Sequence, residues 1–181
     1  YFPQSESEIE RVKTKYNLPN KFVLSLGTQE PRKNLERLIQ ATAGLSIPLV
    51  IAGKYGWGKK IENPSHVTVL GFVDEADLPA LYSSATVFCY PSLYEGFGFP
   101  VLEAMACGTP VVTSNISSLP EVTGEAAVLV DPLNIESIRS GIEHVIDSSE
   151  NMTTKGIRQA KKFSWEVTAR PVIAIYEKLG N

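Results

Sequence analysis

The chain has 181 residues, 43% of them hydrophobic, and its 17 Lys and Arg against 20 Asp and Glu give a formal net charge of −3. This length predicts one globular domain that can bury a core without disulfides or a metal. The balanced charge argues against a general nucleic-acid-binding protein, and no apolar run approaches the ~18 residues of a membrane span.

Short apolar runs alternate with segments of helical spacing along the chain. The runs predict strands at 22–27, 48–53, 67–71, 86–90, 110–113 and 127–130. Helices are expected at 6–16, 35–42, 75–84, 100–107, 135–146 and in two stretches from Ser149 to the C-terminus. Apolar strands that alternate with helices form parallel sheets covered on both faces. The pattern therefore predicts an α/β fold with a Rossmann-like, doubly wound parallel sheet of about six strands and helices on both faces.

Residues 1–20 are expected to form a lead-in segment and 21–181 the main domain. The chain begins with Tyr1 and has neither an initiator Met nor a signal pattern, which we interpret as a start inside a longer protein. Cys89 and Cys107 lie in apolar stretches and are interpreted as buried thiols. The two histidines stand alone, so no metal site is expected.

In a doubly wound sheet, ligands bind beyond the carboxyl ends of the strands, so the residues after each strand carry the most information. After the first strand, Arg32 and Lys33 are adjacent cations where a loop enters a helix. This arrangement suits an anionic ligand, because the first amides of the helix point the same way. A solvated basic turn is the alternative interpretation.

The run from Gly53 to Lys60, after the second strand, nearly matches the phosphate-binding P-loop pattern. It departs at Lys60, where a Ser or Thr hydroxyl is needed to bind Mg²⁺. We therefore expect a flexible glycine turn here instead of an ATPase site. A nicotinamide dehydrogenase is also disfavoured, since no Gly-x-Gly-x-x-Gly follows the first strand.

The segment 91–110, after the fourth strand, is the most informative. Gly96 and Gly98 allow a ligand to approach the backbone closely, and their amides open onto a helix N-terminus. Glu95 precedes this loop and Glu103 lies in the first turns of the helix, so both carboxylates can face one pocket. Carboxylates accept paired hydrogen bonds from vicinal sugar hydroxyls. With the two cations after the first strand, this indicates a nucleoside diphosphate sugar; an ordinary tight strand-to-helix turn is the alternative.

The spacing Glu95-x7-Glu103, within Tyr-Glu-Gly-Phe-Gly-Phe-Pro-Val-Leu-Glu-Ala-Met-Ala-Cys-Gly-Thr-Pro, resembles the signature of retaining glycosyltransferases of family 4. The chain is similar to their C-terminal, nucleotide-sugar-binding domain of the GT-B fold. The similarity covers nearly the whole chain, including 26–34, 71–73, 119–124, 131–132 and 163–165. The run 27–34 resembles bacterial and archaeal members described as mannosyltransferases.

The resemblance implies a role for each matching residue. Glu103 would bind the ribose, Glu95 the transferred sugar and Lys33 the diphosphate. Many members carry an Arg directly after the glycine of the first strand, where this chain has Thr28, and we expect Arg32 to supply the missing charge. Contacts with the donor are implied at Gly27, Thr28, Val73, Gly96, Phe97, Gly98 and Phe99.

The resemblance implies the donor-binding half of a retaining, metal-independent enzyme that transfers a hexose, such as mannose, to a glycan or lipid-linked acceptor. The donor would be GDP-mannose or a UDP-sugar, and no cofactor is expected. The partner would be an N-terminal acceptor domain of the same chain, without which this domain is expected to be inactive. The whole enzyme would lie in the cytoplasm, at the inner membrane surface through that domain.

Two alternatives remain. A sugar-nucleotide epimerase or a sugar phosphorylase can share the same architecture, although no lysine here is a clear candidate for binding pyridoxal phosphate. A nucleotide-sugar-binding module that has lost catalysis belongs to another class. The presence of Glu95, Glu103 and Lys33 together argues against such a loss.

Overall fold

The computed structural model describes residues 1–58, 61, 63–148 and 151–179. Its strands are β1 (Val23–Leu26), β2 (Leu49–Ala52), β3 (Val67–Gly71), β4 (Val87–Tyr90), β5 (Val111–Ser114) and β6 (Val128–Val130). Its helices are α1 (Glu6–Tyr16), α2 (Leu35–Thr42), α3 (Leu78–Ser84), α4 (Phe99–Ala106), α5 (Leu119–Thr123), α6 (Ile135–Asp147), α7 (Met152–Ala160) and α8 (Trp165–Leu179). Two short 3-10 helices are η1 (Pro31–Lys33) and η2 (Glu75–Asp77).

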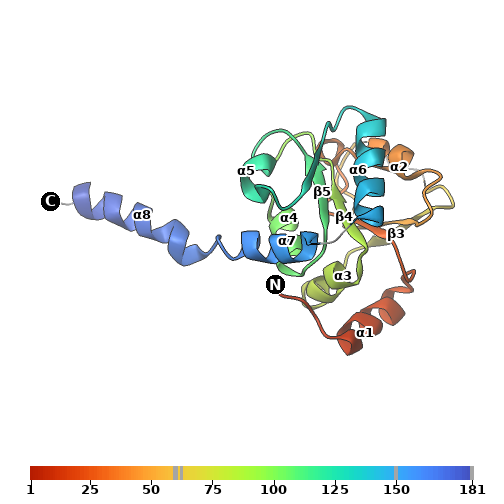
Figure 1. Cartoon of the computed structure of the whole chain (residues 1–181), viewed down its shortest axis with the longest axis horizontal. Helices are drawn as coiled ribbons and strands as arrows, with labels where there is room; N and C mark the ends of the chain where they lie inside the picture. The colour runs from red at the N-terminus through yellow and green to blue at the C-terminus, as the bar shows by residue number, and fades with distance from the viewer. Residues whose placement is uncertain (59–60, 62, 149–150, 180–181) are drawn as a thin grey trace.

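The strands form one six-stranded sheet in the order β3-β2-β1-β4-β5-β6, with every neighbouring pair parallel. Val23 of β1 lies opposite Leu49 of β2 and Val87 of β4. The strand order changes direction between β1 and β4, and such a switch point leaves a crevice at the carboxyl ends of the strands. The predicted Rossmann-like, doubly wound fold is confirmed (Figure 1).

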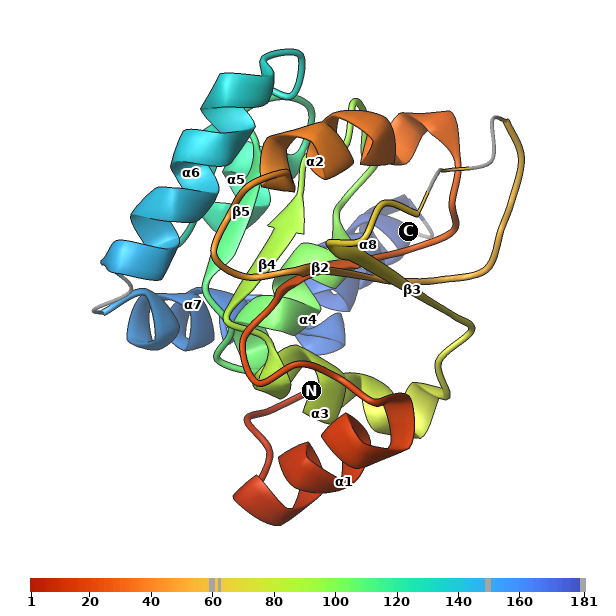
Figure 2. The same ribbon diagram turned by 90° about the vertical axis from the view of Figure 1, so that its right-hand side faces the viewer.

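Successive strand residues point to opposite faces of the sheet, and each face has its own core. One core contains Phe88 and Cys107 and is covered by α3 and α4. The other contains Leu49 and Cys89 and is covered by α2 and α6. Figure 2 shows these helix pairs on the two sides of the sheet. Both cysteines are buried and unpaired, as predicted.

The lead-in segment contains the predicted helix, α1, which packs against α3. The buried carboxylate of Asp77 joins the two. Its oxygens lie 2.9 Å from Arg11 Nη2 and 2.6 Å from Lys15 Nζ, and the Tyr16 hydroxyl donates to it at 2.8 Å. Residues 1–20 are therefore attached to the body of the molecule. The boundary after residue 20 stays a prediction.

Some predicted elements differ from the structure near prolines. The helix predicted at 75–84 is divided into η2 and α3, and Pro79 occupies the first turn of α3. Proline lacks an N–H and fits only the first turn of a helix, so it marks a new start. The helix predicted from Pro100 begins one residue earlier, at Phe99. The sequence analysis missed α5, which has only five residues.

Two predictions fall partly on residues outside the described ones. Lys60, which breaks the P-loop pattern, and Ser149, the expected start of a helical stretch, are both in this group. The helix in that stretch, α7, begins at Met152.

Helix α8 projects from the body of the molecule in Figure 1, and none of its residues is buried. Its exposed apolar side chains include Val172, Ile173, Ile175, Tyr176 and Leu179. In the part of the chain that the structure describes, no helix combines the length and the apolar character that crossing a membrane requires.

Candidate functional site

The loops that follow β1 and β4 are connected at the carboxyl edge of the sheet. The amide of Leu93 donates to the carbonyl of Arg32 at 2.8 Å. Asn34 Nδ2 donates to the carbonyls of Pro91, at 2.9 Å, and Pro132, at 2.7 Å. Asn34 is buried and has a left-handed φ of 59°, which Asn tolerates better than most residues. These bonds hold η1, with its two cations, against the loop after β4.

Glu95, in the loop after β4, lies between those cations. Its Oε1 is 2.8 Å from Lys33 Nζ and its Oε2 is 2.7 Å from Arg32 Nη1. Arg32 also pairs with Glu30 at 2.5 Å and donates to the carbonyl of Tyr94 at 2.8 Å. Burial tends to raise the pKa of Glu95, but the bonds from Lys33 and Arg32 outweigh it and hold that pKa below its ordinary value. Glu95 therefore stays ionised.

Tyr90, the last residue of β4, is a site residue that the sequence analysis missed. Lys33 Nζ donates to its hydroxyl oxygen and lies 4.7 Å from the centre of its ring. Burial raises the pKa of Tyr90, and the negative charge of Glu95 raises it further. A tyrosine inside an apolar strand cannot be distinguished by sequence from an ordinary core residue.

The backbone of the loop before α4 is held by two serines from the segment after β5, which were also missed. Ser118 Oγ donates to the carbonyls of Glu95, at 3.0 Å, and Phe97, at 2.8 Å. The amide of Glu95 donates to Ser117 Oγ at 3.2 Å. Gly98 ends the loop with a φ of 104°, and a Cβ there would lie 2.7 Å from a methyl carbon of α5. The loop therefore needs glycine at this position.

The predicted donor-binding residues after β1 are Gly27, which lies next to Lys33, and Thr28, which lies next to the loop after β2. A Cβ on Gly27 would lie 3.3 Å from Lys33 Cε, so the bare glycine leaves room for the lysine side chain. Thr28 is exposed, and a Cβ on Gly56 would lie 2.5 Å from its Cγ2. The loops after β1 and β2 are thus in close contact.

The remaining predicted donor-binding residues follow β3 and β4. Val73 is buried directly after β3. Gly96 is exposed. The rings of Phe97 and Phe99 lie 4.8 Å apart, and the ring of Phe163 lies 5.7 Å from that of Phe97. An aromatic cluster therefore borders the start of α4.

Glu103, on α4, has different surroundings from Glu95. The Tyr82 hydroxyl of α3 donates to its Oε2 at 2.9 Å. Burial raises the pKa of Glu103 above its ordinary value, although the Tyr82 hydroxyl opposes this. Burial and the nearby charge of Glu103 raise the pKa of Tyr1 to about 12. Among the described residues, no Lys or Arg forms an ion pair with Glu103.

A pocket of about 880 Å³ adjoins Glu103. Its lining includes residues 1–3, Phe99 and Leu102 of α4, and Trp165 of α8, but not Glu95. The structure therefore joins Glu95 to the two predicted cations and places Glu103 in a separate group of contacts. This pocket does not support the prediction that both carboxylates face one cavity.

The arrangement offers two kinds of recognition. Lys33 and Arg32 present adjacent positive charges beside the switch point, where an anion can compete with Glu95 for them. The two carboxylates can accept hydrogen bonds from hydroxyl groups. Within the described ranges, no group of three or more His, Cys, Asp or Glu side chains could hold a metal ion.

Residues 6–163 match the family Glycosyl transferases group 1. O-antigen chain mannosyltransferase B of Escherichia coli is 41% identical over an alignment 197 residues long, which covers 99% of this chain and 52% of that protein. The serotype-specific mannosyltransferase WbdA of Escherichia coli is 36% identical over an alignment 199 residues long, which covers 97% of this chain and 24% of that protein. The chain thus spans about half of the first relative and about a quarter of the second.

Solved structures share the same architecture. Sucrose-phosphate synthase of Thermosynechococcus elongatus superposes with a TM-score of 0.81 at 25% identity, covering 99% of this chain and 49% of that one. HepE of Anabaena, in complex with UDP and glucose, gives 0.81 at 22% identity, covering 99% of this chain and 54% of that one. The fold of this chain is therefore the Rossmann-like fold of GT-B glycosyltransferases. From the family match over most of its length, the chain belongs to the group 1 glycosyl transferases.

Proposed function

We propose that this chain binds a nucleoside diphosphate sugar and forms the donor-binding part of a retaining glycosyltransferase. The observation that carries this proposal is the cluster of Lys33, Arg32 and Glu95 at the switch point between β1 and β4. Two cations suit a diphosphate, and the adjacent carboxylate suits the hydroxyls of a sugar attached to it.

In this proposal Lys33 and Arg32 bind the diphosphate and stabilise the negative charge that develops as it leaves. The amides at the start of α4, opened by Gly98, add to that stabilisation. Glu95 and the diphosphate compete for the same cations. A bound donor would therefore weaken the ion pairs of Glu95 and leave its oxygens available to the hydroxyls of the transferred sugar.

Glu103 is assigned to the ribose. Its half-buried carboxylate lies beside a pocket and lacks an ion-pair partner in the described chain, so it can accept charge-assisted hydrogen bonds from the ribose hydroxyls. Val73, after β3, would meet the base through its backbone. No step in this scheme needs a metal, which makes independence of metal ions a testable part of the proposal.

The sugar is proposed to be a hexose, with mannose as the first choice. The names of two relatives, both mannosyltransferases of Escherichia coli, support mannose and hence GDP-mannose as donor. Because HepE was solved in complex with UDP and glucose, UDP-sugars are the second candidate donors. The acceptor would be a glycan or a lipid-linked glycan at the inner membrane surface.

The acceptor is proposed to bind a second, N-terminal domain of a longer chain. The relatives extend well beyond the matched region, and the exposed apolar side chains of α8 suit contact with another domain. We therefore expect the 181-residue chain alone to transfer no sugar. Turnover by the purified chain, with full-length enzyme excluded, would contradict this part of the proposal.

The test is a thermal-shift and calorimetric comparison of GDP, UDP and ADP, each with and without its sugar. A ligand at a hundred times its Kd should add about 2.7 kcal/mol to the free energy of unfolding. Chelation of divalent ions with EDTA should leave the shift unchanged. Lys33→Met should abolish it, whereas Lys155→Met, which removes the same charge from an exposed position on α7, should not. If none of the three diphosphates binds, the proposed function is wrong.

A further inference from the structure

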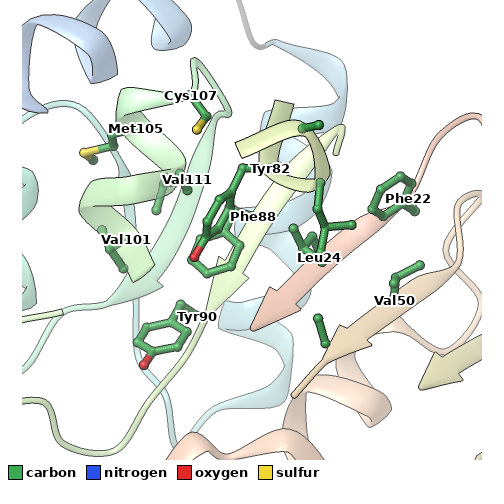
Figure 3. Packing of buried hydrophobic residues seen from close by; sticks show 14 of the residues in the cluster. Phe22, Leu24, Val50, Tyr82, Phe88, Tyr90, Val101, Met105, Cys107 and Val111 are labelled. Atoms are coloured by element: carbon green, nitrogen blue, oxygen red, sulfur yellow. The ribbon is translucent and has the colours of Figure 1, made fainter. Parts of the chain in front are cut away.

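Three buried aromatic rings lie between Glu103 and the cluster of Lys33, Arg32 and Glu95. Tyr82 of α3 meets Phe88 of β4 edge to face, with ring centres 5.3 Å apart and planes at 75°. Phe88 is stacked on Tyr90, at 5.7 Å and 20°. Each of the three is at most 2% exposed. Figure 3 shows them together in the core between α4 and the neighbouring strands.

The rings at the two ends carry hydroxyls, and each hydroxyl contacts a different charged side chain of the site. Tyr82 donates to Glu103 Oε2 at 2.9 Å, whereas the Tyr90 oxygen accepts a hydrogen bond from Lys33 Nζ. Buried tyrosine hydroxyls need partners, but a backbone carbonyl would serve that need equally well. Here both hydroxyls are hydrogen-bonded to side chains that, in the proposed function, bind the donor.

The stack also limits how far these hydroxyls can move. Tyr82 and Tyr90 have few rotatable bonds and are packed on Phe88, so their oxygens lie at fixed positions in the core. Lys33 and Glu103 are long side chains that lose conformational freedom when a ligand orders them. A hydrogen bond from a fixed hydroxyl removes part of that freedom before the ligand arrives.

We infer that Tyr82 and Tyr90 are positioning residues for the donor: Tyr82 orients Glu103 toward the ribose, and Tyr90 orients Lys33 toward the diphosphate. The inference rests on the proposed function. Neither tyrosine needs to touch the donor, because each acts through its charged neighbour. A purely structural role for the two hydroxyls predicts altered stability with unchanged selectivity among ligands. A positioning role predicts that each hydroxyl controls recognition of a different part of the donor.

The experiment measures two selectivity ratios by calorimetry on the 181-residue chain. The first is the affinity for GDP divided by the affinity for its 2′,3′-dideoxy analogue, and it reports on the ribose. The second is the affinity for GDP divided by the affinity for GMP, and it reports on the terminal phosphate. The uridine or adenosine series replaces these ligands if the wild-type chain binds UDP or ADP instead. Tyr82→Phe should lower the first ratio about fivefold to tenfold, the size of one hydrogen bond, and leave the second unchanged. Tyr90→Phe should lower the second ratio by a similar factor and leave the first unchanged.

Tyr16→Phe is the matched control. It removes another tyrosine hydroxyl bonded to a carboxylate, that of Asp77 at 2.8 Å, in the contact between α1 and α3. Neither ratio should change in this variant. If a Phe variant does not fold, 4-fluorophenylalanine and 4-aminophenylalanine at the same position replace it. The first closely matches tyrosine in shape without donating, and the second restores a donor and should restore the Tyr82-dependent ratio.

The outcomes separate the inference from the proposed function. Unchanged ratios in both Phe variants, or equal changes in both ratios, overturn the inference while the proposed function stands. If the wild-type chain binds none of GDP, UDP and ADP, the proposed function fails and the inference fails with it. The inference is established if Tyr82→Phe lowers only the first ratio and Tyr90→Phe lowers only the second.

Discussion

Glu95 and Glu103 belong to one short segment of the chain, yet their surroundings are opposite. Glu95 lies between two cations from η1, which hold its pKa below the ordinary value despite burial. Glu103 is bonded to a neutral hydroxyl from α3, and burial raises its pKa. The same residue type thus acquires two electrostatic states from partners distant in sequence. Environments that separate the pKa values of two carboxylates are typical of sites in which the two have different tasks.

The comparison also separates charges that stabilise the fold from charges that do not. The Glu95 cluster is neutralised within the chain, so its members hold each other in place. Glu103 has no ion pair with a Lys or Arg among the described residues. Hydrogen bonds from tyrosine hydroxyls favour its ionised form, but burial outweighs them, so ionisation of Glu103 costs stability. A half-buried carboxylate kept under these conditions fits a residue retained for ligand binding.

The largest effect is expected from Lys33→Met, which breaks the Glu95 cluster. The side chains of Lys33 and Glu95 are only 11% and 9% exposed, so the variant leaves a buried carboxylate with Arg32 as its remaining cation. We expect the free energy of unfolding to fall by about 3 kcal/mol and diphosphate binding to be lost. Urea unfolding at neutral pH measures the first effect, and calorimetry measures the second.

The double variant Lys33→Met, Glu95→Gln tests the reason for that loss. If an uncompensated charge causes it, removing the carboxylate charge should recover part of the stability without restoring diphosphate binding. A double variant no more stable than Lys33→Met would show that packing of the lysine side chain, and not charge, maintains the cluster.

The next effect separates the two glutamates by their ligands. Glu103→Ala should weaken the bare diphosphate and the sugar nucleotide by similar factors, about tenfold or more, because both contain the ribose. Glu95→Ala should weaken the sugar nucleotide, because Glu95 is assigned to the sugar, but it should not weaken the bare diphosphate, which competes with Glu95 for Lys33 and Arg32. Calorimetric titration of each variant with both ligands measures the four affinities.

One result would reverse this division of roles. If Glu95→Ala loses the bare diphosphate as severely as Glu103→Ala does, then Glu95 acts mainly by positioning Lys33 and Arg32. Glu121→Ala, which changes a glutamate on α5 with no ion pair to either cation among the described residues, is the control and should bind both ligands normally.

A smaller effect concerns the sign of the pH dependence. The pKa of Glu95 is lowered by folding, so its contribution to stability is present above the unfolded pKa and is lost as the pH falls through the folded pKa. The pKa of Glu103 is raised, so its contribution is present below the unfolded pKa and is lost as the pH rises through the folded pKa. At neutral pH, Glu95→Gln should therefore be less stable than wild type and Glu103→Gln more stable.

Both differences should shrink on acidification, because protonated glutamate and glutamine are alike in shape and charge. Urea unfolding from neutral pH down through the carboxylate range measures them. Stability differences of the same sign at neutral pH would show that the two carboxylates do not differ as described.

Much of the fold and part of the site could be predicted from the sequence. Short apolar runs that alternate with helical segments indicate a covered parallel sheet, and that topology brings the carboxyl ends of β1 and β4 together. The meeting of Arg32 and Lys33 with Glu95 follows from this rule, although these residues are far apart in the chain. The distinct surroundings of Glu103 did not follow from it, because they depend on which side chain of α3 faces α4.

The residues that were missed act through contacts that no local pattern marks. Tyr82 and Tyr90 lie in apolar segments and resemble core residues until their hydroxyls are located. Ser117 and Ser118 resemble ordinary turn residues, yet they hold the backbone around Glu95. Alternation and periodicity identify the face of an element, but they do not show which single polar atom on that face has a charged partner.

The smallest effect is expected outside the site, at Asp77. Like Glu95, this carboxylate is buried and bonded to two cations. It also accepts a hydrogen bond from the Tyr16 hydroxyl, and its pKa is lowered to about 2, although burial opposes the shift. It lies between α1 and α3 and away from the switch point. Tyr16→Phe removes one of its hydrogen bonds and should lower the free energy of unfolding by about 1 kcal/mol at neutral pH. Loss of that bond should also raise the pKa of Asp77, so the variant should begin to unfold at a higher pH than wild type during acid titration. Its affinity for a nucleoside diphosphate should equal that of wild type. A weakened affinity would mean that any loss of stability reduces binding, and the different ligand effects expected for Glu95 and Glu103 could then not be assigned to their contacts.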